Sequence, residues 1–376
     1  MKYCKKCLQT DTRPNTKFSE DGICPACQYF ETLKNVDWIE RKEELKKIVE
    51  FGKQNNHSGY DCIIGVSGGK DSTRQACFVK DVLGMKPLLV CLSPPPIQLT
   101  RRGADNISNL INLGFDCITI NPAPKIWKDL MRHSFFEFIN GFKSTELALF
   151  SSVPRLAIAY QIPLIWWGEN SALQLGELTV MGKSGSDGNN LKHMNTLGGG
   201  DITWMLNNEL KKNDILQYCY PKDEEMELAN LRITFLGYFW KDWSLIDNGN
   251  FSALRGLDVR PEGPKEIGDY MGITALDEDW TPLNQMIKYL KFGFGRITDY
   301  ANEDIRLGRM TRNEAIKIVE RFDGNCSPVF IKSFCDFIEI SVDEFWNVVD
   351  KGVNKNLFKK TGQGKYERLF KVGENI

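Results

Sequence analysis

The motif "GVSGGKDS", residues 65–72, is the most informative part of the sequence. The apolar run 61–64 precedes it, and the segment 71–84, which ends at Gly84, is typical of a helix. A strand that leads through a glycine loop into a helix directs backbone N–H groups and the positive end of the helix dipole at an anion. The sequence therefore predicts a cradle for a phosphate group.

The spacing in this loop separates it from two common nucleotide-binding loops. A Walker A loop needs a glycine where this chain has Ile64 and a serine or threonine where it has Asp71, and the G-x-G-x-x-G fingerprint is absent from the sequence. The loop instead resembles the PP-loop of the N-type ATP pyrophosphatases, whose members release pyrophosphate and transfer AMP. The resemblance implies that the ATP-binding residues are Ser67, Gly68, Gly69, Lys70, Asp71 and Ser72.

Two charged residues of the loop are candidates for catalysis. A carboxylate beside a bound polyphosphate is unfavourable unless a cation lies between them, so we assign Asp71 to Mg²⁺. Lys70 either contacts a phosphate or is simply solvated, and the sequence leaves both open.

Strand and helix patterns alternate on both sides of the loop. This alternation predicts an α/β fold with a doubly wound parallel sheet, which binds ligands outside the carboxyl ends of its strands. The expected fold is of the PP-loop ATP pyrophosphatase (HUP-like) type. The expected strands are 61–67, 86–93, 115–121 and 162–168, and the expected helices are 37–54, 71–84, 100–114 and 146–161.

Four cysteines near the N-terminus have the spacing of a metal site. The pairs Cys4-x2-Cys7 and Cys24-x2-Cys27 are separated by 16 residues, a spacing that suits one Zn²⁺ held by four thiolates. The segment between the pairs has little hydrophobic pattern, so it needs the metal to fold. We expect a structural Zn²⁺, because four thiolates leave no open coordination position; the alternatives are a lost site or a redox site.

The overall composition restricts the function classes. Lys and Arg number 48 against 49 Asp and Glu, so a nucleic-acid partner is unlikely. We expect a soluble, cytoplasmic protein without membrane contact, because no signal peptide and no apolar run long enough to span a bilayer is present. The expected organisation is a zinc ribbon at 1–35, a PP-loop domain at 36–245 with a mobile loop near 176–215, and a mainly helical region at 246–376 that contributes to the substrate site.

The chain as a whole resembles the N-acetyl sugar amidotransferases of the WbpG and PseA type. The resemblance rests on "YCKKCLQTDTRPNTKFSEDGICPAC" (3–27), on "GVSGGKDS", on "IWWGEN" (165–170) and on the stretch 279–316 that contains "KYLKFGFGR". It covers residues near 1 to 330. It implies conversion of a sugar acetamido group to acetamidino in bacterial surface-polysaccharide (LPS O-antigen) or flagellin-glycan (pseudaminic acid) pathways.

The implied reaction explains the need for ATP. An amide oxygen is a poor leaving group until adenylation makes it an AMP ester, after which ammonia adds and AMP departs. The chain has no recognisable glutaminase triad. The resemblance therefore implies two partners similar to the subunits of imidazole glycerol phosphate synthase, a glutaminase and an ammonia-conducting cyclase-like subunit.

Further site residues follow from strand ends and from the resemblance. Glu169 and Asn170 follow an apolar strand and could handle ammonia and the acetamido group, or could cap a helix. Ser93 ends the second strand and could meet the adenosine. Lys288, Lys291 and Arg296 could bind the charged part of the substrate, or could form a solvated face.

Two other functions remain open at this stage. A tRNA thiolase or lysidine-type tRNA modifier can also combine a PP-loop with zinc-bound cysteines, although it would need a basic RNA-binding face. A non-catalytic module that recruits a glutaminase is the second alternative, and the intact PP-loop disfavours it.

Overall fold

The computed structural model describes residues 1–376 except 169–170, 175, 177–184, 195 and 208. A five-stranded, fully parallel sheet with the order β3-β2-β1-β4-β5 forms its centre. The predicted fold class is confirmed, and the strand order reverses direction between β1 and β4. The strands are β1 (Cys62–Gly65), β2 (Pro87–Leu92), β3 (Asp116–Ile120), β4 (Leu164–Trp167) and β5 (Arg232–Phe235).

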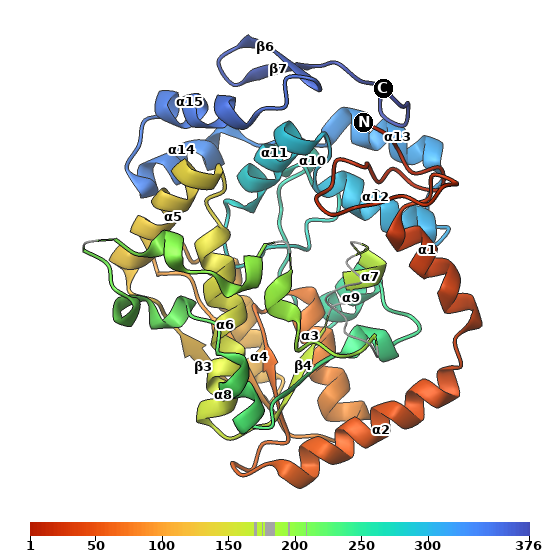
Figure 1. Cartoon of the computed structure of the whole chain (residues 1–376), viewed down its shortest axis with the longest axis vertical. Helices are drawn as coiled ribbons and strands as arrows, with labels where there is room; N and C mark the ends of the chain where they lie inside the picture. Colours follow the sequence, from red (N-terminus) through yellow and green to blue (C-terminus); the bar gives the residue numbers. More distant parts are fainter. Residues whose placement is uncertain (169–170, 175, 177–184, 195, 208) are drawn as a thin grey trace.

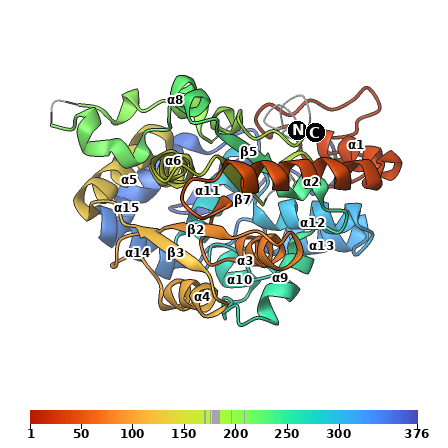
Figure 2. The same cartoon turned by 90° about the horizontal axis from the view of Figure 1, so that it is seen from below.

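Helices cover both faces of the sheet, which explains why its strands are apolar throughout. On one face Ile64 packs with residues of α2, α3 and α4, and on the other Ile63 packs with residues of α6 and α8. Figure 2 shows α3 and α4 on one side of the strands and α6 and α8 on the other. These helices and their neighbours are α2 (Trp38–Asn55), α3 (Lys70–Cys77), a π-helical turn η2 (Phe78–Val82), α4 (Arg101–Asn112), α5 (Pro124–Phe138), α6 (Lys143–Ala159), α7 (Ser171–Gln174), α8 (Asp223–Leu228) and α9 (Leu245–Ala253).

The C-terminal region is mainly helical, as predicted, and closes with a β-hairpin that the sequence did not predict. Its core is shared with the α/β part, because Phe135 of α5 and Leu147 of α6 pack in the same cluster as Leu283 and Phe334. The predicted boundary at residue 246 remains a prediction. The elements are α10 (Pro264–Ile267), α11 (Thr281–Phe292), α12 (Arg296–Arg306), α13 (Arg312–Phe322), α14 (Pro328–Ile338), α15 (Val342–Gly352), β6 (Phe358–Gly362) and β7 (Lys365–Arg368).

The N-terminal segment lies against the C-terminal helices. Figure 1 shows residues before α1 (Pro25–Thr32) beside α12 and α13, with both chain ends close together. The backbone N–H of Leu8 donates to Oδ1 of Asn302 over 2.7 Å, and Leu8 is buried in the C-terminal core. Leu8 therefore completes a core that α5, α6 and the C-terminal helices share.

The predicted loop near 176–215 contains short helical turns in its described part. These are η4 (Leu191–His193), η5 (Gly198–Gly200), η6 (Thr203–Met205) and the start of η7 (Lys212–Tyr218). Elsewhere η1 (Leu33–Asn35) follows α1 and η8 (Leu236–Phe239) follows β5. None of the helices in the described part of the chain has the length and apolarity that a membrane crossing requires.

Candidate functional site

The PP-loop lies at the carboxyl end of β1. The strand order reverses between β1 and β4, and parallel α/β sheets bind ligands at such a point. Gly69 precedes the first turn of α3, so the loop leads directly into a helix N-terminus. Gly68 has a φ of +74°, and a Cβ there would lie 3.0 Å from the backbone of Asn106. A side chain at this position would be strained and crowded, so the turn requires glycine.

A cavity of about 190 Å³ opens over the loop. The loop forms one wall, and the end of β4 forms another together with Leu149 and Phe150 of α6. Residues 273–275, far along the chain, form the third. The lining residues from the loop and α3 are Gly65, Val66, Ser67, Gly69, Lys70, Asp71, Ser72 and Gln75.

Lys70 and Asp71 form an ion pair at the floor of this cavity. The Nζ of Lys70 lies 2.8 Å from Oδ2 of Asp71. Lys70 is only 4% exposed, so the alternative of a solvated lysine is wrong. Asp71 is partly exposed to the cavity, and each of its carboxylate oxygens keeps a further lone pair, so the residue fits the predicted Mg²⁺ ligand.

Hydrogen bonds from residues of α9 hold Asp71 in position. Nδ2 of the fully buried Asn248 donates to Oδ1 of Asp71 over 2.7 Å, and Nη1 of Arg74 donates to Oδ1 of Asn248 over 2.7 Å. Ser252, also in α9, donates from Oγ to the carbonyl oxygen of Lys70 over 2.8 Å. Sequence reasoning missed this support, because no motif marks α9.

A second cavity, of about 170 Å³, adjoins the first at Ser67, which lines both. Ser93 lines this cavity at the end of β2, where the sequence placed it; its Oγ donates to the carbonyl oxygen of Pro94 over 3.1 Å. The remaining lining is mostly apolar, which suits a flat base. The other lining residues are Cys91, Leu92, Pro94, Leu99, Gly103, Ala104, Ile107, Thr119 and Asp277.

The predicted residues Glu169 and Asn170 lie outside the described residues. The preceding residue, Gly168, lines the phosphate cavity at the carboxyl end of β4. Their predicted roles therefore remain predictions.

The three predicted substrate cations lie apart from the two cavities that meet at Ser67, as far as the described residues go. The Nζ of Lys288 lies 2.7 Å from Oδ2 of Asp299, and burial lowers the pKa of Lys288. Lys291 donates to the carbonyl oxygen of Phe138 over 2.7 Å. Arg296 lines a small cavity with Thr274, which also faces the phosphate cavity, so it is the nearest of the three. Substrate binding by these residues stays a prediction.

The four N-terminal cysteines come together as predicted. Their sulfur atoms all lie within 4.8 Å of one another, and all four residues are buried. Backbone N–H groups of Gln9 and Cys24 donate to Sγ of Cys7 and of Cys4, over 3.4 and 3.2 Å. Four buried thiols with N–H donors around them fit a metal ion held by four thiolates.

Helix α12 runs between the cysteines and the PP-loop. Ile305 packs against the cysteine cluster. Burial opposes the charged form of Arg306, but the charges of Cys7, Cys24 and Cys27 together favour it, so its pKa is raised. One turn earlier, burial raises the pKa of Glu303 to about 7, and the charges of Asp71 and Lys70 also act on this carboxylate. The helix thus presents charged groups to both sites.

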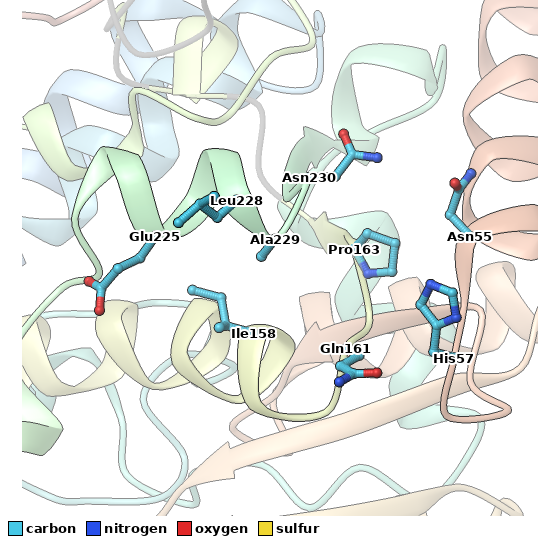
Figure 3. A pocket seen from close by; sticks show the side chains of 9 residues that line it. All are labelled: Asn55, His57, Ile158, Gln161, Pro163, Glu225, Leu228, Ala229 and Asn230. Atoms are coloured by element: carbon cyan, nitrogen blue, oxygen red, sulfur yellow. The ribbon is translucent and has the colours of Figure 1, made fainter.

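A larger cavity, about 630 Å³, lies at the opposite end of the sheet (Figure 3). Its wall includes His57 and Asn55 near the start of β1, Pro163 before β4, and the exposed Leu228 of α8. Ligands of parallel sheets bind at the carboxyl ends of the strands, so we do not assign the reaction to this amino-terminal side.

Several solved structures are similar to parts of the chain at low identity. An NH3-dependent NAD synthetase from Campylobacter jejuni is 19% identical with a TM-score of 0.29, over 38% of this chain and 61% of the synthetase. An NMN synthetase from Francisella tularensis is 17% identical with a TM-score of 0.29, over 60% of this chain and 89% of that protein. The U34-tRNA thiolase NcsA from Methanococcus maripaludis, solved with its [4Fe-4S] cluster, is 13% identical with a TM-score of 0.30. The similarity covers 90% of this chain and 96% of the thiolase.

Comparison at the level of sequence families gives one match. No curated protein matches the chain. Residues 266–372 match the family described as "LPS biosynthesis protein WbpG-like, C-terminal domain". This match includes residues 273–275 of the phosphate cavity and the whole stretch 279–316, one of those that carried the sequence resemblance. The C-terminal region of this chain, residues 266–372, is therefore similar to the WbpG-like C-terminal domain family.

Proposed function

We propose that the protein is an ATP-dependent, AMP- and pyrophosphate-forming C–N ligase. In this proposal it converts the acetamido group of an N-acetylated, nucleotide-linked sugar to acetamidino during bacterial surface-glycan synthesis. One observation carries the proposal: the PP-loop and the WbpG-like region line the same cavity, the first through residues 65–72 and the second through residues 273–275. The coarser reading, an enzyme that uses ATP, rests on the loop geometry alone.

The proposed chemistry has two steps. The amide oxygen of the acetamido group attacks the α-phosphorus of ATP, pyrophosphate leaves, and an imidate ester of AMP forms. Ammonia then adds to the imidate carbon and AMP departs with the former amide oxygen, so the sugar gains C=NH in place of C=O. Holding the reacting atoms in line is the main contribution that the protein makes to the first step.

The residues of the loop have separate roles in the proposed first step. In this proposal the backbone N–H groups at the start of α3 and the hydroxyl of Ser67, which lines the cavity, hold phosphate oxygens. Lys70 supplies a buried positive charge for the departing pyrophosphate. Mg²⁺, when bound, would neutralise further phosphate charge, and Asp71, positioned by Asn248, would hold it.

The N-terminal cysteines are proposed to hold a structural metal ion, Zn²⁺ by the preference of four thiolates. An iron–sulfur cluster uses the same donor set, so the metal content must be measured. The partners proposed for ammonia supply are a glutaminase and a cyclase-like, ammonia-conducting subunit. Because the reaction consumes ATP, the proposal places the enzyme in the cytoplasm.

A tRNA-modifying enzyme is less well supported by the structure. Thiolation commonly needs a reactive cysteine pair outside the metal site. The thiols of Cys62 and Cys91 are buried in strands, and burial raises the pKa of both. A high pKa leaves little thiolate for nucleophilic attack.

The decisive experiment combines purified protein with ATP, Mg²⁺, ammonium at alkaline pH and a panel of nucleotide-linked N-acetylated sugars. Mass spectrometry is expected to show AMP, pyrophosphate and a sugar in which NH replaces oxygen, in equal amounts. AMP formation that requires tRNA and does not depend on any of the sugars would overturn the proposal in favour of the RNA-modifying alternative. The Asp71→Asn variant, run in parallel, excludes a contaminating ATPase.

A further inference from the structure

A loop of the C-terminal region crosses the junction of the two nucleotide-site cavities. Residues Ile273, Thr274 and Ala275 line the phosphate cavity, and Asp277, two residues later, lines the second cavity. Both cavities share Ser67 of the PP-loop, so they adjoin at this residue. The loop is therefore placed to contact a nucleotide from its phosphates to its base.

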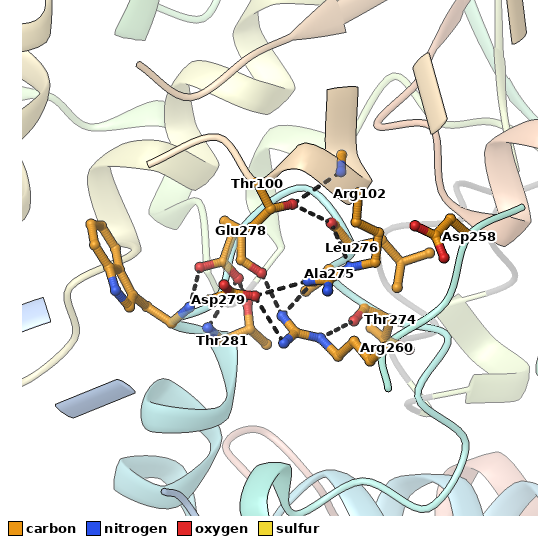
Figure 4. A network of polar contacts seen from close by, with 12 residues as sticks. Thr100, Arg102, Asp258, Arg260, Thr274, Ala275, Leu276, Glu278, Asp279 and Thr281 are labelled. Carbon is orange, nitrogen blue, oxygen red and sulfur yellow. Dashed lines mark hydrogen bonds and ion pairs between the residues drawn. The ribbon is translucent and has the colours of Figure 1, made fainter. Parts of the chain in front are cut away.

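Two arginines and a threonine fix the backbone of this loop (Figure 4). Arg260 donates from Nη2 to the carbonyl oxygen of Ala275 over 2.7 Å, and Arg102 donates from Nε to that of Leu276 over 3.0 Å. The N–H of Thr100, just before α4, donates to the carbonyl oxygen of Asp277 over 3.0 Å. Asp277 is consequently held in a defined position before any ligand binds.

Three consecutive acidic residues in this loop have different environments. Oε1 and Oε2 of Glu278 accept hydrogen bonds from the backbone N–H groups of Thr281 and Trp280, over 2.9 and 2.6 Å. The carboxylate of Asp279 lies 2.8 Å from Arg102 and 3.1 Å from Arg260. The carboxylate of Asp277 has no ion pair and no hydrogen bond to another residue within the described part of the chain. Burial raises its pKa, and the charges of Arg260 and Arg102 only partly offset this rise.

We infer that Asp277 recognises the base of the nucleotide: its carboxylate accepts a hydrogen bond from the exocyclic amino group of adenine. The mostly apolar lining of the second cavity suits a purine ring, and the carboxylate is its one acidic side chain among the described residues. A purine with a carbonyl oxygen at the same position, as in inosine or guanosine nucleotides, would face the carboxylate with a second acceptor. Asp277 is thus a specificity residue for ATP, an inference that rests on the proposed function.

The test measures equilibrium binding of ATP and of ITP, each with Mg²⁺ and without sugar, by calorimetry. Wild-type protein is expected to bind ATP at least about tenfold more tightly than ITP, because a hydrogen bond to a charged group is lost and an acceptor opposes an acceptor. Asp277→Asn should bring the two affinities to within about threefold, because the amide can donate as well as accept. Asp277→Ala should weaken ATP binding to the level of ITP.

The control is Asp105→Asn, which removes the same charge from an exposed position of α4 and should leave the ratio of ATP to ITP affinity unchanged. An unaltered ratio in Asp277→Asn, or equal binding of ATP and ITP by wild-type protein, would overturn the inference and leave the proposed function intact. Wild-type protein that binds neither nucleotide would overturn both.

Discussion

Asn248 fixes the position of Asp71: its Nδ2 donates over 2.7 Å to the carboxylate oxygen Oδ1, from a residue 177 positions further along the chain. The same side chain accepts from Arg74 in α3. One buried amide therefore connects α3 and α9 and sets the direction of the carboxylate that faces the phosphate cavity.

Asn248→Ala should destabilise the protein and weaken Mg²⁺ binding together. The substitution leaves the guanidinium of Arg74 and one oxygen of Asp71 without this partner, which costs about 1–3 kcal/mol of unfolding free energy. Denaturant unfolding measures the first effect, and the Mg²⁺ concentration for half-maximal AMP formation measures the second. Asn250→Ala, exposed on the same helix, is the matched control. An unchanged Mg²⁺ requirement would show that Asn248 acts on stability alone.

Asp71→Asn should abolish ATP cleavage without unfolding the protein. The amide keeps the shape of the side chain but removes the negative charge that attracts Mg²⁺, and losses of about 100-fold or more are typical for such electrostatic groups. AMP release measured by chromatography gives the result. Asp81 is exposed in η2, the helical turn that follows α3, so Asp81→Asn should retain full activity. Activity in Asp71→Asn within a few-fold of wild type would remove Asp71 from the reaction.

The cysteine cluster should contain one metal site per chain, and elemental analysis will tell zinc from iron. Cys7→Ser is expected to lose the metal and to lower the unfolding free energy by about 3 kcal/mol or more, because it removes one of four ligands and metal binding is coupled to folding of the segment that holds them. Cys117→Ser, a half-buried thiol in β3, should keep the metal. Metal-free protein with full stability would contradict a structural role.

Arg306→Gln should speed removal of this metal by chelators about tenfold. A metal ion with four thiolates carries net negative charge, and the guanidinium next to Cys7, Cys24 and Cys27 offsets it. Its Nε and one terminal nitrogen are buried, and no hydrogen-bond partner for them is present among the described residues. Arg306→Lys should restore most of the retention, whereas Arg321→Gln on α13 serves as control. Equal release rates for Arg306→Gln and wild type would exclude this electrostatic role.

The stability of the protein should fall between about pH 5 and pH 7, partly because of Glu278. Burial raises the pKa of Glu278 from 4.5 to about 7 in the folded state. In this range the folded protein holds more protons than the unfolded one, so the unfolding free energy falls as the pH rises, by at most about 1.4 kcal/mol per pH unit. Denaturant unfolding of Glu278→Gln should show a shallower slope, and the exposed Glu266→Gln should not. An unchanged slope in Glu278→Gln would assign the pH dependence to other groups.

Much of the fold could be predicted because its local patterns agree with the tertiary structure. The strands β1 to β4 are short apolar runs between turn signals, and the helices α11, α13 and α15 have regular amphipathic spacing. The strand β5 was missed because its four residues, Arg232–Phe235, follow a long stretch without regular periodicity and are defined by pairing with β4. The terminal hairpin β6–β7 was missed because its residues are mostly polar and exposed.

The candidate site, too, was predicted only in part from the sequence. The PP-loop and the four cysteines are local motifs, and both could be read from residue spacing. Asn248 and Asp277 reach the site from more than 170 residues beyond the loop, and a single sequence does not show which distant residues meet. Lys291 was placed in a substrate site from its charge, its spacing from Lys288 and its place in the stretch that carries the resemblance. The structure shows it donating to backbone carbonyl groups at the end of α5, and its part in substrate binding stays a prediction.

The hydrogen bond between Leu8 and Asn302 has a consequence for the order of events during translation. Helices α12 and α13, which cover the two cysteine pairs, begin at residues 296 and 312 and therefore leave the ribosome long after Cys27. Until these helices have been made, Leu8 and the two cysteine pairs lack the surface against which they pack. A metal ion captured early by the four cysteines would order this segment while the rest of the chain is still being made.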